Sequence, residues 1–264
     1  MARQKLDKEV RKTILKTRKL VEDITQKDAN EDETRTRIHD IFGTLMGYDR
    51  YKHITMEYAI HGTGETVHCD LAIQIDHEES SKPEFLVEIK RVNIDLAPKH
   101  IRQAASYAID IGCEWVLLTN SREWKLYHIS FGQPPQTKLV ESWHLINDDP
   151  VTLAEKFALI GYKNIKRSGL ARLWEKSNVL TPQNILNIIL SPQSIRSIRR
   201  ELKKTTEVTV SPEEIVGAIR YMLNEAAVGE MEKLRICLPE KKQRRHRITI
   251  SKTNNKEKEA SDGK

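Results

Sequence analysis

Two carboxylates and a lysine between residues 67 and 90 have the types and spacing of a site for hydrolytic chemistry. This segment contains two apolar runs, VHCDLAIQI and FLVEIK, separated by the polar stretch DHEESSKPE. Runs of this length and alternation, broken by Ser, Pro and acidic residues, predict a β-hairpin. If Asp70 pairs with Glu88, the middle of the turn falls near Glu79, inside the polar stretch. The folded hairpin therefore brings Asp70 and Glu88 together.

The chemistry of this hairpin follows from which side chains share a face. Residues two apart on a strand point the same way, so Glu88 and Lys90 lie on one face and the apolar residues take the other. Two carboxylates side by side favour a cation between them, and hard oxygen ligands with open water positions suit Mg²⁺ or Mn²⁺. Lys90 can hold an attacking water or stabilise developing negative charge. A Glu-x-Lys alone is common and indicates an exposed salt bridge. Together with an Asp on the preceding strand of a hairpin, it forms a minimal set of catalytic residues for phosphodiester hydrolysis.

The segments before the hairpin must position it. Residues 1–28 form a charged helical pattern with an apolar stripe, which either packs on the domain or mediates self-association. Asn30 is a good N-cap for a second helix, and Gly47 ends it. The acids of its first turn, Glu31 among them, complement the helix dipole, or one of them reaches the hairpin carboxylates. A strand is predicted over 53–60, with a turn at 61–65 leading into the hairpin.

The segments after the hairpin complete an α/β domain. A helix is predicted to begin near Pro98, with Gln103 and Tyr107 four residues apart on one face. A continuous apolar strand, buried on both faces, is predicted over 115–119, another strand over 124–129, and a further one around 138–143. This order predicts a mixed central sheet flanked by helices.

Residues 30–129 resemble the PD-(D/E)XK nuclease domain found at the N-terminus of type I restriction endonuclease R subunits. The matching stretches are NE and TR of residues 30–35, Met46-Gly47-Tyr48, Asp70, LVEIKR at 86–91, Gln103-x-x-x-Tyr107, and LLTN at 117–120 with Trp124-x-x-Tyr127. The resemblance implies a restriction-endonuclease-like fold. It implies Asp70 and Glu88 as metal ligands, Glu31 as an additional acid beside the metal, and Lys90 as the catalytic lysine. Gln103, Tyr107 and the adjoining Arg91 would tune cleavage or contact DNA.

The chain departs from those R subunits in having neither their length nor a phosphate loop. Its Gly-x-Gly at 62–64 lacks the following Lys-Ser/Thr and helix of a nucleotide cradle, so an ATP-driven motor is not expected. The chain resembles the stand-alone form of the domain.

The C-terminal half differs in charge and in pattern. Residues 1–150 carry 21 Lys and Arg against 25 Asp and Glu, whereas residues 151–264 carry 23 against 13. Thr181-Pro182, Ser191-Pro192 and Ser211-Pro212 each read as an N-cap followed by Pro at the first helical position. One of these helices presents five cations, which form either a solvated face or a surface for the nucleic-acid backbone. They are Arg196, Arg199, Arg200, Lys203 and Lys204.

These patterns predict four segments. They are an N-terminal charged helix (1–28), a nuclease-like α/β domain (29–148), a small all-α domain (149–238) and a disordered basic tail (239–264). With 31% charged residues, no apolar run approaching the ~20 residues of a membrane span, and three scattered cysteines, a disulfide framework and a membrane protein are not expected. A reducing cytoplasm, of a prokaryote or of a phage-infected host, is the expected location.

Three functions are compatible with these features. The leading hypothesis is a Mg²⁺-dependent deoxyribonuclease, with Mn²⁺ able to substitute, that acts as an endonuclease in restriction, phage defence or DNA processing. The alternative is a non-cleaving protein of the same fold that binds nucleic acid or a partner. The third is a nuclease that is active only when a targeting or motor protein accompanies it. One site per chain favours a homodimer if both strands are cut.

Overall fold

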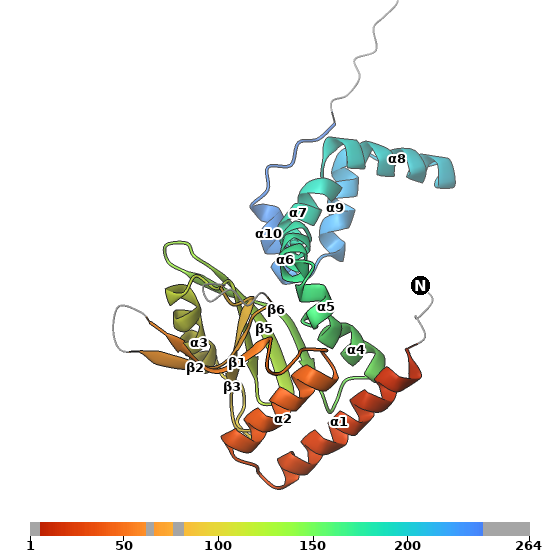
Figure 1. Cartoon of the computed structure of the whole chain (residues 1–264). Coiled ribbons are helices and arrows are strands. Elements are labelled where there is room, and N and C mark those ends of the chain that lie inside the picture. The colour runs from red at the N-terminus through yellow and green to blue at the C-terminus, as the bar shows by residue number, and fades with distance from the viewer. Residues whose placement is uncertain (1–5, 62–65, 76–81, 240–264) are drawn as a thin grey trace, which may run out of the picture. The chain divides into compact units, whose positions relative to one another are not determined.

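A six-stranded sheet forms the centre of the N-terminal part of the protein (Figure 1). The computed structural model describes residues 6–61, 66–75 and 82–239. The chain divides into two compact units, Met1–Val179 and Leu180–Lys264. The sheet and every residue predicted for the hydrolytic site belong to the first unit.

The strands follow one another across the sheet in chain order. They are β1 (Ile54–Ile60), β2 (Val67–Ile73), β3 (Phe85–Ile89), β4 (Trp115–Thr119), β5 (Glu123–Ser130) and β6 (Gln136–His144). The pair β3–β4 is parallel and the other neighbouring pairs are antiparallel. A helix, α3 (Pro98–Asp110), connects the two parallel strands, as a parallel connection requires. The predicted α/β class with a mixed sheet is confirmed.

Helices cover both faces of this sheet. On one face lie α1 (Lys8–Gln26), α2 (Glu31–Thr44), α4 (Pro150–Leu159), α5 (Tyr162–Ile165) and α6 (Gly169–Val179). Their apolar side chains share one core with inward residues of the strands, among them Phe42, Phe85 and Trp124. On the other face, α3 packs Ala104 and Ala108 against Leu86 and its neighbours. Each fully buried Phe or Leu stabilises the folded state by about 2 kcal/mol, so burial on both faces holds the sheet in place.

The N-terminal helix packs on the domain, which is the first of the two alternatives left by its sequence. Ile14, Val21 and Ile24 of α1 are buried, and the helix contacts both α2 and α4, beside which it lies in Figure 1. Its remaining apolar side chains, such as Val10 and Leu20, stay about two-fifths exposed.

The helices after residue 149 divide between the two units. Those up to α6 bury Leu153, Phe157 and Leu170 in the core of the sheet domain. The second unit contains α7 (Pro182–Ile189), α8 (Pro192–Thr206), α9 (Pro212–Met222) and α10 (Glu225–Glu232). The three predicted Ser or Thr N-caps with Pro at the first helical position are all confirmed.

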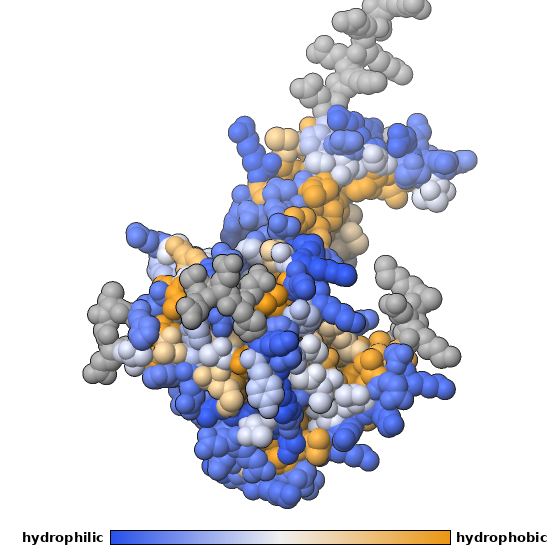
Figure 2. Space-filling model, viewed as in Figure 1, coloured by the Kyte–Doolittle hydropathy of each residue, from blue (hydrophilic) through white to orange (hydrophobic). Residues whose placement is uncertain are grey.

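The small core of the second unit leaves apolar surface exposed. Leu186 and Leu190 of the α7 region are buried with Ile195 and Ile219, whereas Ile188 is 62% exposed and Met222 75% exposed. Apolar side chains accordingly show on the surface of these helices (Figure 2).

Several sequence predictions lie outside the described residues. They concern the hairpin turn around Glu79, the glycines of the turn at 61–65, and all but the first residue of the basic tail, 239–264. Among the residues that are described, no helix is long and apolar enough to span a membrane.

Candidate active site

The predicted hairpin register is confirmed by the pairing of β2 with β3. Leu71 lies opposite Val87 and Ile73 opposite Phe85, so the same register carried one step further sets Asp70 against Glu88. The ladder ends before that step. Instead, the backbone N–H of Ile89 donates to the Oδ2 atom of Asp70 over 2.7 Å. A carboxylate thus replaces a strand carbonyl as the acceptor, and the two strands part where the acids lie.

An irregularity in the neighbouring strand frees Asp70 from the sheet on its other side. In the β1–β2 ladder, Met56 pairs with Leu71 and Tyr58 with Cys69, and between them Glu57 has a left-handed backbone with φ 48°. Residues two apart normally share a face, yet Leu71 belongs to the core under α2 and Cys69 to the core under α3. The side-chain alternation therefore changes phase at Asp70.

Arg35 of α2 holds the second oxygen of Asp70. Its Nε and Nη2 atoms donate to Asp70 Oδ1 over 3.1 and 2.7 Å, and its Nη1 donates to Asp32 Oδ1 over 3.1 Å. The side chains of Arg35 and Asp70 are 18% and 12% exposed, so most of this ion pair is removed from water. The same guanidinium lies 3.9 Å from Glu57 Oε1.

Glu88 and Lys90 form the second ion pair of the site. Lys90 Nζ donates to Glu88 Oε1 over 2.7 Å, with side-chain exposures of 18% and 5% respectively. The two residues are adjacent on one face of β3, as the alternation predicted. The backbone N–H of Lys90 donates to the carbonyl of Thr119 on β4, which fixes the end of the strand.

The acids outnumber the cations around this cluster, and the titration behaviour reflects it. Burial raises the pKa of Glu88, Lys90 opposes this, and the charges of Asp70 and Glu31 add to it. Burial lowers the pKa of Lys90, but its hydrogen bond to Glu88 and the charges of Glu88, Glu31 and Asp70 outweigh that and raise it. Both shifts favour the protonated form, chiefly through burial for Glu88 and through the surrounding carboxylates for Lys90. Such a site attracts a further cation.

Glu31 approaches the hairpin from the first turn of α2. Its charge acts on Arg35, Glu88 and Lys90, although no hydrogen bond joins it to them. The N-cap Asn30 accepts from the Glu33 N–H over 2.9 Å, and the hydroxyl of Thr34 accepts from the N–H of Val92 over 3.2 Å. These bonds attach the start of α2 to the chain just after Lys90.

The other predicted residues make contacts of their own. Arg91 donates to the carbonyls of Asp28 and Ala29 and pairs with the Asp28 carboxylate, tying β3 to the turn between α1 and α2. Exposed Gln103 donates to the Tyr107 hydroxyl over 2.8 Å, and the half-buried Tyr107 packs against the core under α3. The five cations of α8 belong to the second unit, and all are exposed: Arg196, Arg199, Arg200, Lys203 and Lys204.

Three neighbours of the acids were not singled out from the sequence as site residues. Arg35 contacts Asp70, Glu57 approaches the Arg35 guanidinium, and His100 of α3 lies close enough to respond to Lys90 and Glu31. For Arg35 a signal existed, because it lies four residues after Glu31 and so on the same face of α2. Nothing in the local sequence marks Glu57, whose role depends on the pairing of β1 with β2.

The donor set of the site fits a divalent cation of the Mg²⁺ class. Asp70 and Glu88 supply hard carboxylate oxygens, and Mg²⁺ is usually held by one or two carboxylates with waters and substrate phosphate completing its shell. Within the described part of the chain, no group of three or more His, Cys, Asp or Glu side chains is arranged to hold a metal. The two carboxylates are therefore the set to consider, with Glu31 nearby.

Comparison with known families decides what this arrangement resembles. Residues 30–141 match the family model described as the type I restriction enzyme R protein N terminus (HSDR_N). This segment is similar to the restriction enzyme R N-terminal domain. The resemblance inferred from the motifs is confirmed, and the matched segment includes the whole of the candidate site. Searches of curated proteins and of solved structures found no match.

Proposed function

We propose that this protein is a metal-dependent endonuclease that hydrolyses phosphodiester bonds of DNA. The observation that carries the proposal is the meeting of Asp70 with the Glu88–Lys90 pair, inside a segment that matches the restriction enzyme R family. The similarity to that family supports a role in cleaving foreign DNA, in restriction or phage defence.

Asp70 and Glu88 would hold a Mg²⁺ ion, for which Mn²⁺ could substitute, with Glu31 as an additional acid. Such an ion polarises a phosphate oxygen and lowers the pKa of a bound water. Arg35 and the Ile89 N–H hold the two oxygens of Asp70 in place, which limits the reorganisation of the ligand.

Lys90 is the residue proposed to act on the reacting atoms. Its raised pKa keeps it protonated at neutral pH, so it can donate to the attacking water or to a phosphate oxygen as charge accumulates there. The bond to Glu88 aims the ammonium group along the face of β3 that carries both. Removing one such preorganised donor typically costs a factor of about 10² to 10³ in rate.

The test is cleavage of supercoiled plasmid in Mg²⁺ or Mn²⁺ by the wild type and by Lys90→Ala. Strand β5 provides a matched control, because Glu123 and Lys125 form another Glu-x-Lys ion pair, 3.0 Å apart, without a facing Asp. Lys125→Ala should cut like the wild type, whereas Lys90→Ala should lose at least ~100-fold.

Two outcomes would contradict the proposal in different ways. If the wild type and Lys90→Ala nick the plasmid equally, the hairpin is not the source of the activity. If the wild type binds DNA but never cuts it, the isolated chain is a binding module. In that case a targeting or motor partner would be tested for its ability to restore cleavage.

A further inference from the structure

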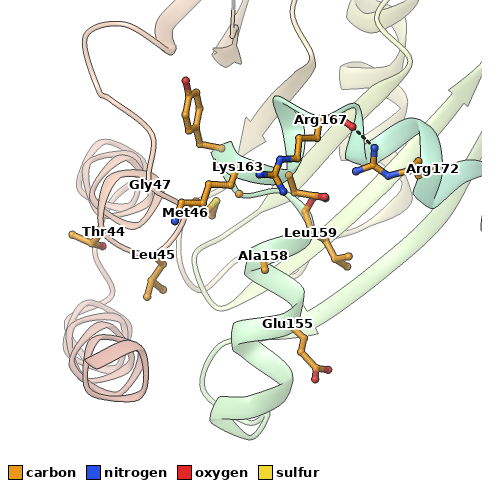
Figure 3. Close-up of a pocket in the computed structure, with 13 residues that line it drawn as sticks. Thr44, Leu45, Met46, Gly47, Glu155, Ala158, Leu159, Lys163, Arg167 and Arg172 are labelled. Carbon is orange, nitrogen blue, oxygen red and sulfur yellow. Dashed lines mark hydrogen bonds between the residues drawn. The ribbon is translucent and has the colours of Figure 1, made fainter. Parts of the chain in front are cut away.

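A pocket of about 620 Å³ lies in the first unit (Figure 3). It is at the C-terminal end of α2, whereas Glu31 and Arg35 of the candidate active site lie in the first turns of that helix. One side is formed by residues 44–47, where α2 ends, and the other by residues of α4, α5 and α6. Leu45, Met46, Ala158 and Leu159 give it an apolar floor. Its volume is that of an ordinary small-ligand site.

The basic wall of this pocket is held by specific contacts. The Tyr162 N–H donates to the Met46 carbonyl over 2.9 Å, and the Asn164 side chain donates to the Leu159 carbonyl over 2.7 Å. Gly161 lies against this contact, since a Cβ built on it would be 3.3 Å from the Phe157 carbonyl oxygen and 3.4 Å from that of Met46. The pocket is thus a formed feature of the fold.

Three cations line the pocket from this wall: Lys163, Arg167 and Arg172. None of the three pairs with a carboxylate among the residues that the structure describes, and all three are exposed. The Arg172 guanidinium donates to the carbonyl of Arg167, which directs it along the rim (Figure 3). Residues 162–176 contain five Lys and Arg against one Asp or Glu, and Glu155 is the one acid that lines the pocket. Unpaired cations around a pocket favour a phosphate group.

Helix α2 joins this pocket to the acidic site. Its first turn carries Glu31, the next carries Arg35, and its last residue, Thr44, lines the pocket. At 1.5 Å per residue its 14 residues span roughly 20 Å. Successive phosphates of one DNA strand advance about 3.4 Å along the axis, so this span corresponds to about six base pairs. A duplex in the active site would be long enough to reach the pocket.

We propose that this pocket, lined by Lys163, Arg167 and Arg172, binds a backbone phosphate of the DNA duplex engaged by the active site. The proposal rests on the proposed nuclease function for the identity of the ligand. It places a DNA contact within the sheet unit itself, through three cations that follow the matched segment in the chain, in addition to the cations proposed on α8. A small phosphate compound would present the same phosphate group to these cations and is the alternative ligand that the test must exclude.

The test is binding of a fluorescent 24-base-pair duplex to the full-length protein in EDTA, measured by anisotropy at several salt concentrations. The variant K163E/R167E should bind at least ~10-fold more weakly than the wild type. Its slope of log affinity against log salt should fall by about 2, one for each cation that no longer neutralises a phosphate. The control K16E/K19E makes the same charge change on exposed residues of α1 and should weaken binding much less.

The outcomes separate this proposal from the proposed function. If K163E/R167E binds the duplex like K16E/K19E while the wild type cleaves plasmid, the pocket proposal is overturned and the nuclease stands. If the wild type cleaves nothing but K163E/R167E still binds the duplex selectively more weakly, the pocket proposal stands without the nuclease. If titrated pyrophosphate binds the wild type but not K163E/R167E, and duplex affinity is unchanged between them, the pocket takes a free phosphate compound and the DNA proposal fails.

Discussion

The ion pair of Glu88 and Lys90 makes a quantitative prediction about stability as well as activity. The substitution Lys90→Met keeps the bulk of the side chain but leaves the Glu88 carboxylate, 5% exposed, without its cation. Removing one partner of a fully buried pair costs about 3–5 kcal/mol, because the other charge stays buried. Since the Lys90 side chain is 18% exposed, some water can replace it, and about 2–3 kcal/mol is expected at neutral pH.

The dependence on pH follows from the raised pKa of Glu88. Without Lys90 this pKa rises further, because Lys90 is the neighbour that lowers it. The destabilisation by Lys90→Met should therefore be fully present above this raised pKa and shrink as the pH falls through it, because a neutral Glu88 needs no cation. The double variant E88Q/K90M removes both charges, so its free energy of unfolding should lie within about 1 kcal/mol of that of the wild type.

Urea unfolding followed by tryptophan fluorescence measures these differences for the first unit alone. All four tryptophans, at 115, 124, 143 and 174, belong to that unit. A loss of 2–3 kcal/mol lowers the midpoint by about 1 M urea for a typical slope. The control Lys125→Met breaks a more exposed pair and should cost less than about 1 kcal/mol. Equal midpoints for Lys90→Met and the wild type at pH 7 would refute the burial argument.

Three further predictions concern the parts that support the site. Arg35→Met should destabilise the first unit by about 2 kcal/mol at neutral pH and reduce cleavage, because Asp70 loses two hydrogen bonds. In an Asp70→Asn background the same substitution should cost clearly less stability, and equal costs in both backgrounds would disprove the coupling. Gly47→Ala should lower the free energy of unfolding by about 1 kcal/mol, since φ is +75° there, whereas Gly43→Ala inside α2 should not destabilise the protein. Urea midpoints measure both variants, and an unchanged midpoint for Gly47→Ala would contradict the predicted backbone strain. In native protein a thiol reagent should label Cys237 quickly and the other two cysteines slowly, because Cys69 and Cys113 are buried and burial raises their pKa values to about 12 and about 11. Fast labelling of all three cysteines would contradict this prediction and show that the core opens readily.

Most of the fold was predictable because its signals are local. The alternation of the hairpin gave the register that sets Asp70 against Glu88, and the unbroken apolar run at 115–119 predicted a strand buried on both faces, as β4 is. The caps at Asn30, Ser191 and Ser211 were also readable, since a helix N-terminus is satisfied by a side chain within three residues.

The sequence by itself determined the central acids and the lysine, because spacing along one strand fixes which side chains share a face. The tertiary structure alone decided which charges surround them. Arg35 meets Asp70 and Glu57 approaches the same guanidinium only because α2 and β1 are brought to β2 by the fold. The left-handed Glu57 also breaks an alternation that sequence reasoning takes as regular. The phosphate pocket likewise joins residues 44–47 to residues 155–172, which are more than 100 positions apart. Such contacts depend on the packing of distant elements, for which a local pattern carries no signal.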